Sequence, residues 1–197
     1  MRFHVVRTGL VATCAMTLDG RRQILCLNVA GDVICAMSAK GAECWCEALA
    51  PSEICELDLT SQAARLRGEP GFLRALFDLA HDRLERSAAH LIALGRLDGM
   101  ERLCGFLAEM TRRTGRRIGQ RWLVCLPMSR EDIADYLGLN SDTVSRLMTR
   151  IKQAGLVRFL SVSEFEVASL ERLEDRVPNS LARHLSDCEQ PDEELML

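Results

Sequence analysis

Hydrophobic positions along this chain change their spacing, and each spacing predicts a different kind of element. Between residues 4 and 58, short apolar runs alternate with polar positions, as in strands that bury one face. Asp19-Gly20 separates two such runs and predicts a hairpin turn. The same alternation places Cys44 and Cys46 on one face of a strand. We therefore expect the first part of the chain to be an all-β meander or roll.

A helical spacing of three and four residues runs from Pro70 to Leu94. This apolar stripe is longer than a helix of one small domain needs, and it indicates either a dimer seam or a helix lying across the β-roll. We favour the dimer seam. Its predicted interface residues are Leu73, Leu76, Phe77, Ala80, Leu84 and Leu91.

Two further helical patterns follow a hinge at Asp98. Asp98 is a good N-cap for a helix over residues 99–114, which Gly115 ends. Between residues 127 and 156, two short apolar periods flank a Leu-Gly-Leu turn, the pattern of a helix-turn-helix. Ser129 and Asn140 are the expected caps of these two helices.

The end of the chain holds two short strand-like runs over residues 156–167, as expected for a wing, and then an acidic stretch. Beyond about residue 175 we expect a frayed tail. The net charge is −3, but residues 111–158 hold ten basic side chains against four acidic ones. A basic segment in an acidic chain indicates a module that binds a polyanion.

The remaining composition excludes several classes of protein. No apolar run approaches the length of a spanning helix, and the N-terminus does not resemble a signal peptide, so we expect a cytoplasmic protein with no membrane contact. No phosphate loop, catalytic triad or metal-ligand spacing of histidines is present in the sequence, so we do not expect an enzyme. An odd count of nine cysteines argues against a disulfide framework. Four of them lie in apolar runs and are expected in the core: Cys14, Cys26, Cys104 and Cys125.

The stretch LPMSREDIADYLGLNSDTVSRLMTRIKQAGLV resembles the helix-turn-helix of the Crp/Fnr family of bacterial transcription regulators, and most closely its FNR/FixK branch. The likeness extends upstream to about residue 4, through a dimerisation helix to strands similar to the cyclic-nucleotide-binding β-roll. The resemblance implies that Asp142, Ser145 and Arg146 read bases on a palindrome with TTGAT-like half-sites. Ser141 lies on the same exposed face of the predicted helix, and we add it to the base-reading residues. Phosphate contacts are expected from Ser129, Arg130, Thr143, Thr149, Arg150 and Lys152.

Three departures limit what the resemblance implies. Ala36 and Ala42 stand where the cAMP-binding members carry a glutamate and an arginine, so cAMP is not an expected ligand. Family members carry a further N-terminal part of the β-roll, and we expect that part to be missing here. In FNR-like oxygen sensors a [4Fe–4S] cluster needs four thiolates, three of which belong to that missing part. The candidates left for a cluster or a thiol-based redox response are Cys55, Cys44, Cys46 and Cys35, with inert buried thiols as the alternative.

These observations predict an α+β protein with a partial β-roll over 1–69, a dimerisation helix and hinge over 70–97, a winged helix-turn-helix over 98–175 and a tail over 176–197. The expected function is regulation of transcription as a homodimer on double-stranded DNA, with RNA polymerase as a further partner and a redox or oxygen signal. One alternative is a truncated regulator that forms mixed dimers with a full-length paralogue and antagonises it. Another is a sensor that binds only a small molecule or a cluster.

Overall fold

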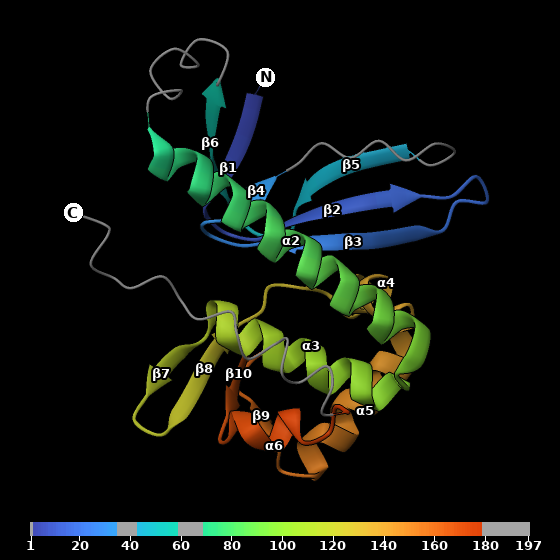
Figure 1. Ribbon diagram of the computed structural model, residues 1–197. Helices are drawn as coiled ribbons and strands as arrows, with labels where there is room; N and C mark the ends of the chain where they lie inside the picture. Colours follow the sequence, from blue (N-terminus) through green and yellow to red (C-terminus); the bar gives the residue numbers. More distant parts are fainter. Residues whose placement is uncertain (1, 35–42, 59–68, 179–197) are drawn as a thin grey trace. The chain divides into compact units, whose positions relative to one another are not determined.

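The computed structural model describes residues 2–34, 43–58 and 69–178. The chain divides into two compact units, Met1–Ser87 and Ala88–Leu197, and one long helix, α2, crosses the division. The predicted α+β class, with a β-sheet roll domain, helices and a C-terminal helix-turn-helix, is confirmed (Figure 1).

Two antiparallel sheets of three strands each form the first unit, with strand orders β4-β1-β6 and β3-β2-β5. Figure 1 shows the strands of the two sheets running in different directions. The strands are β1 Arg2–Thr8, β2 Val11–Met16, β3 Arg22–Asn28, β4 Val33–Ile34, β5 Glu43–Ala48 and β6 Glu53–Asp58.

Gly9 separates β1 from β2. Its φ is +95°, and a Cβ there would lie 2.2 Å from Ser52 Oγ. Only glycine adopts such a left-handed conformation, so close to another segment of the chain, without strain. The Ser52 hydroxyl accepts a hydrogen bond from the Leu10 amide at 3.2 Å. The chain therefore leaves one sheet and enters the other at Gly9.

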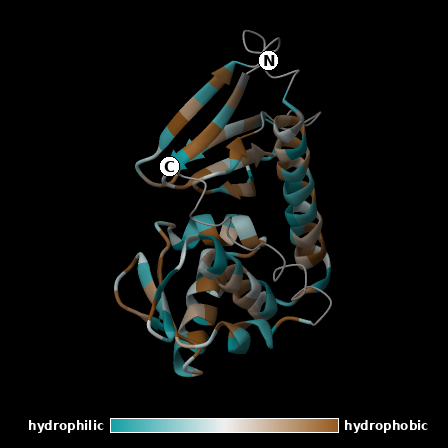
Figure 2. Ribbon diagram, turned by 60° about the vertical axis from the view of Figure 1, so that its left-hand side comes forward, coloured by the Kyte–Doolittle hydropathy of each residue, from teal (hydrophilic) through white to brown (hydrophobic). Residues whose placement is uncertain are grey.

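Among the described residues of this unit, the interior is apolar except for two buried polar residues, Thr13 and Asn28. Val6, Val11 and Ile34 form a buried cluster, and brown and teal segments alternate along the strands in Figure 2. Asn28 is fully buried, but its amide donates to the Val11 carbonyl at 3.0 Å and its carbonyl accepts from Arg83 at 3.1 Å. Because a buried polar group is costly unless it is paired, these bonds make Asn28 compatible with the core.

Helix α2 covers Pro70–Arg96. Within the first unit, two arginines join it to β4 and to the turn before β4. Arg83 donates to the Val33 carbonyl at 2.8 Å, and Arg86 pairs with Asp32 at 3.2 Å.

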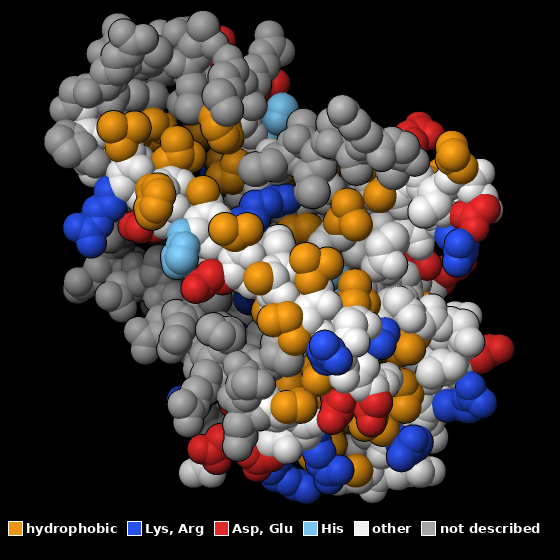
Figure 3. All heavy atoms as spheres, turned by 45° about the vertical axis from the view of Figure 1, so that its right-hand side comes forward, with side chains coloured by type: hydrophobic (Ala, Val, Ile, Leu, Met, Phe, Trp, Pro, Cys, Tyr) orange, Lys and Arg blue, Asp and Glu red, His pale blue; other side chains and the backbone are white. Residues whose placement is uncertain are grey.

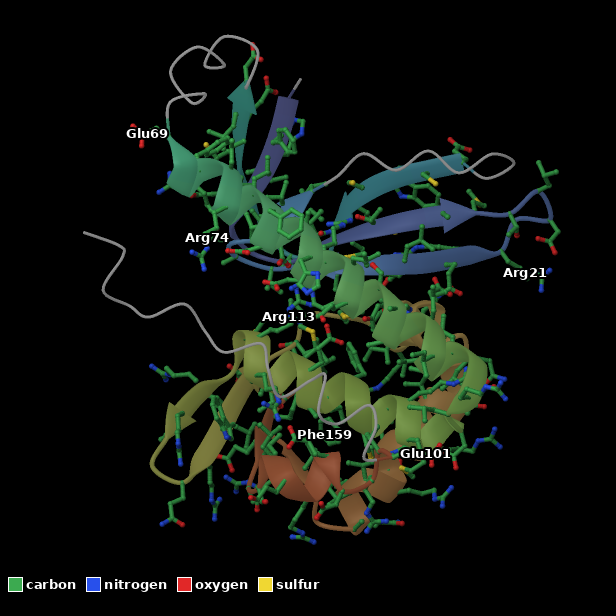
Figure 4. All side chains as sticks on the ribbon, in the orientation of Figure 1. Arg21, Glu69, Arg74, Glu101, Arg113 and Phe159 are labelled. Atoms are coloured by element: carbon green, nitrogen blue, oxygen red, sulfur yellow. The ribbon has the colours of Figure 1, made fainter. Side chains whose placement is uncertain are left out.

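The second unit is a helix-turn-helix with a four-stranded antiparallel sheet of order β7-β8-β10-β9. Glu101 and Arg113 lie toward opposite ends of α3, its longest complete helix (Figure 4). The elements are α3 Gly99–Thr114, β7 Arg116–Ile118, β8 Arg121–Cys125, α4 Arg130–Leu137, α5 Ser141–Gln153, β9 Val157–Phe159, β10 Glu164–Val167 and α6 Leu170–Glu174. The sequence did not predict the β7–β8 hairpin or α6, because both are too short to show a period.

Candidate nucleic-acid interface

Helix α5 has one buried and one exposed face, as its spacing predicts. Four apolar side chains point into the unit: Val144, Leu147, Met148 and Ile151. Ser141, Asp142, Ser145 and Arg146 are all exposed. The structure thus brings the four predicted base-reading residues together on one solvent-facing surface, which we call the outer face of α5.

The start of α5 is held firmly. Asn140 accepts a hydrogen bond from the Thr143 amide at 2.7 Å, which pairs an otherwise free amide of the first turn. Gly138, in the turn before it, has a φ of +63°, and a Cβ there would lie 3.2 Å from a Leu94 methyl. A larger residue would therefore strain the turn between α4 and α5.

The predicted phosphate contacts differ in their surroundings. Thr149, Arg150 and Lys152 are exposed on α5, and the Thr149 hydroxyl donates to the Ser145 carbonyl at 3.0 Å. Thr143 is half-buried, and its hydroxyl oxygen accepts from the Arg146 guanidinium at 3.1 Å.

The two predicted phosphate residues at the start of α4 already have contacts within the protein. The Ser129 hydroxyl accepts from the Asp132 amide at 3.0 Å, and the Asp132 carboxylate accepts from the Ser129 amide. The predicted cap at Ser129 is therefore confirmed, as part of a reciprocal capping box. The Arg130 guanidinium lies 5.6 Å from the centre of the Phe159 ring, and burial lowers its pKa. Phe159 lies in the wing, on β9 (Figure 4).

Arg102 and His90 link α2, α3 and α4 within the second unit. These two residues were not identified from the sequence. Arg102 on α3 donates to the Leu97 carbonyl after α2 at 2.9 Å and to the Leu137 carbonyl at the end of α4 at 3.0 Å. His90 on α2 stacks on Tyr136 of α4, with ring centres 4.2 Å apart. The sequence carries no signal for the contacts of Arg102 with Leu137 and of His90 with Tyr136, since these partners lie far apart along the chain.

The groups near His90 include an acidic side chain, Glu109, and a basic one, Arg102. Glu109 on α3 accepts from the Tyr136 hydroxyl at 3.5 Å and from Arg113 at 2.9 Å. Burial lowers the pKa of His90, the nearby Glu109 raises it and Arg102 lowers it. Burial is the largest of these effects.

The wing is formed by β9 and β10. Phe159 and Phe165 pack with ring centres 6.2 Å apart. Glu166 accepts hydrogen bonds from Arg158 at 2.9 Å and from Arg121 of β8 at 3.3 Å, and the Arg158 bond chiefly lowers the pKa of that carboxyl. These two arginines of the basic segment are therefore partly neutralised within the protein.

The candidate cluster cysteines do not come together in the described structure. Cys44 and Cys46 lie on β5, whereas Cys55 lies on β6 of the other sheet. Cys35, like Ala36 and Ala42, lies outside the described residues. No three His, Cys, Asp or Glu side chains of the described ranges are arranged to hold a metal ion. The three described candidates, Cys44, Cys46 and Cys55, therefore do not form a cluster site by themselves.

One prediction about the cysteines is wrong. Cys125 was expected in the core but is exposed, because the alternation along β8 turns it to the outside and its neighbour Val124 to the inside. Cys14 and Cys104 are buried as predicted, and Cys26 is half-buried.

The predicted dimer residues lie on the exposed side of α2. Leu73, Phe77, Leu84 and Leu91 are 58%, 73%, 68% and 69% exposed. Ala80 is exposed as well, and Leu76 is half-buried. Figure 3 shows hydrophobic side chains following one another along this helix.

Within the described residues, no helix has the length and hydropathy needed to cross a membrane.

A β-roll connected through a long helix to a winged helix-turn-helix defines the class of Crp-like proteins. Residues 101–176 match the model of the Crp-like helix-turn-helix domain. The nitrogen fixation regulation protein FixK of Rhizobium meliloti is 32% identical over 170 residues, which are 86% of this chain and 75% of that protein. The chain therefore belongs to the Crp/Fnr family, in its FixK-like branch.

Two further likenesses agree with this assignment. FixK of Azorhizobium caulinodans is 34% identical over 155 residues, or 78% of this chain, which spans 62% of that relative. The solved structure of FixK2 from Bradyrhizobium japonicum superposes with a TM-score of 0.77 at 30% identity, covering 90% of this chain and 87% of that one.

Proposed function

We propose that this protein is a sequence-specific DNA-binding regulator of transcription that acts as a homodimer. The observation that carries the proposal is the outer face of α5, where four polar side chains project from a helix whose other face is buried. A helix of this kind fits the major groove, where each base pair presents a distinct pattern of donors and acceptors.

The side chains of the outer face suit different base edges. The Arg146 guanidinium can donate two hydrogen bonds to one guanine, and the Asp142 carboxylate can accept from a cytosine amine. Ser141 and Ser145 carry hydroxyls that reach several edges. Arg150 and Lys152, further along α5, suit phosphates, which set the position of the helix rather than the sequence it reads.

The homodimer is supported by the exposed stripe on α2. Phe77, Leu84 and Leu91 recur every seven residues, with Leu73 and Ala80 in the alternate positions. Such a heptad seam packs well against a second copy of itself. A two-fold pair would present two α5 helices to half-sites one helical turn apart, in agreement with a TTGAT/ATCAA palindrome. RNA polymerase as a partner and a redox or oxygen signal belong to the same proposal.

The test is fluorescence anisotropy of the full chain on a TTGAT/ATCAA duplex and on a scrambled duplex, over a series of salt concentrations. Arg146→Ala should cost roughly 1–3 kcal/mol on the palindrome and little on the scramble. Arg150→Ala is the matched control: it should weaken both duplexes alike and reduce the slope of log affinity against log salt by about one. Equal affinity of the unmodified protein for the two duplexes would exclude sequence-specific reading. Running the series with and without oxygen tests the proposed signal.

A further inference from the structure

Thr143 and Arg146 are linked on the outer face of α5. The Arg146 guanidinium donates to Thr143 Oγ1 at 3.1 Å, and the two residues lie three positions apart, where side chains of a helix are neighbours. Thr143 is half-buried and Arg146 is exposed. The Thr143 hydroxyl therefore contacts the guanidinium group that is proposed to read guanine.

Thr143 is much more constrained than Arg146. Its amide is bound by the Asn140 cap at 2.7 Å, which fixes the backbone at this position. Its branched Cβ leaves few allowed rotamers in a helix, so the direction of its hydroxyl is restricted. Arg146 has a long, flexible side chain, and bidentate recognition of guanine requires its planar fork in one orientation. A fixed acceptor beside a flexible donor reduces the orientations that DNA binding must otherwise select.

We propose that Thr143 is a positioning residue for Arg146: its hydroxyl oxygen holds the guanidinium in the orientation that reads guanine and so contributes to the choice of DNA sequence. This inference rests on the proposed function and adds to it. While the Thr143 oxygen accepts a hydrogen bond from Arg146, the hydroxyl proton can still be donated to a phosphate. The positioning role and the phosphate contact have different effects on DNA affinity. A phosphate contact supports binding to every sequence, whereas positioning of Arg146 supports only the duplex that carries the guanine.

The experiment measures the ratio of affinities of the full chain for two duplexes that differ only at the guanine assigned to Arg146. Thr143→Val keeps the branched shape and removes the hydroxyl, and Thr143→Ser restores a hydroxyl. Thr149→Val is the matched control, because that hydroxyl is also on α5 and donates to a backbone carbonyl instead. Each change is made with Arg146 present and with Arg146→Ala.

We expect Thr143→Val to lower the ratio about two- to tenfold, the worth of one hydrogen bond, and Thr143→Ser to restore most of it. Thr149→Val should leave the ratio unchanged, and Thr143→Val should lower it no further once Arg146 is alanine. An equal loss on both duplexes, or a loss that persists without Arg146, would overturn the proposal.

Two further outcomes separate the inference from the proposed function. If Arg146→Ala lowers the ratio and Thr143→Val does not, the positioning role fails while base reading by Arg146 stands. If Arg146→Ala leaves the ratio unchanged, both fail. Thermal unfolding of each variant verifies folding, and Thr143→Ala, which has a better helix propensity, replaces the valine variant if that one does not fold.

Discussion

The described cysteines differ in how deeply their thiols are buried, and this difference affects their reactivity. Cys104 is fully buried, and burial raises its pKa to about 11. Burial also raises the pKa of Cys14, against an opposing effect of Arg22. Cys46, Cys55 and Cys125 are exposed. Because the thiolate is the reactive form, a raised pKa and restricted access both slow its chemistry.

We therefore expect a maleimide to label Cys46, Cys55 and Cys125 of the native protein quickly, and Cys14 and Cys104 only slowly. Raising the pH from 7 to 9 should leave Cys104 slow, since it stays below the pKa of that thiol. Mass spectrometry of peptides over a time course measures each site, and labelling in denaturant provides the control. Cys104 reacting as fast as Cys125 would contradict the described burial.

Single elements show how local bonds support the proposed interface. The cap at Asn140 pairs the Thr143 amide, and the left-handed Gly138 directs the chain from α4 into α5. Both features are local, and both fix the start of the helix whose outer face is proposed to read DNA.

Asn140→Ala should lower the free energy of unfolding by about 1 kcal/mol, the usual worth of an N-cap. Asn140→Ser, which can still cap the helix, should retain most of the stability. Urea unfolding followed by circular dichroism measures both variants. An alanine variant as stable as the unmodified protein would show that the cap contributes nothing.

The stack of His90 on Tyr136 predicts a dependence of stability on pH. An unfolded histidine has a pKa of about 6.5, and burial lowers the folded value. Between the two values the unfolded chain binds more protons, so stability rises with pH there. The contribution is fully present above about pH 6.5 and is lost as the pH falls toward the folded value.

Urea unfolding between pH 5 and pH 8 should therefore show a smaller loss of stability at low pH for His90→Phe, which keeps an aromatic ring beside Tyr136, than for the unmodified protein. His81→Gln, at an exposed position of the same helix, is the control for general effects of losing a histidine. Parallel pH profiles of the unmodified protein and His90→Phe would contradict this prediction.

At the scale of the whole molecule, α2 is the element that belongs to both units, and its apolar stripe continues from one to the other. Large exposed apolar surfaces are uncommon on proteins that act as monomers. The heptad spacing of the stripe explains how a second copy would cover it.

Leu84→Glu should therefore convert the proposed dimer to a monomer at micromolar concentration. It should also weaken binding to the proposed palindrome, because two half-sites are no longer read together. Leu79→Glu is the matched control, since Leu79 is also exposed on α2 but lies off the stripe. Light scattering after size exclusion measures the mass, and anisotropy measures DNA binding. A dimer that survives Leu84→Glu and not Leu79→Glu would place the seam on another face.

Elements whose causes are local could be predicted from the amino-acid sequence. The buried and exposed faces of α5, the Asn140 cap and the hairpin turn at Gly20 follow from spacing and from partners within four residues. The outer face of α5 was predictable for the same reason, because a helix of known period has a known outer face once its apolar residues are assigned to the core.

Contacts between groups far apart along the chain could be found only in the folded protein. The stack of His90 on Tyr136, the bond of Arg102 to the Leu137 carbonyl and the contact of Arg130 with the Phe159 ring join residues with no shared period. The exposure of Cys125 depends on which face of the wing sheet packs on the helices. These outcomes result from packing between surfaces, and the spacing of residues along one element does not specify its partner.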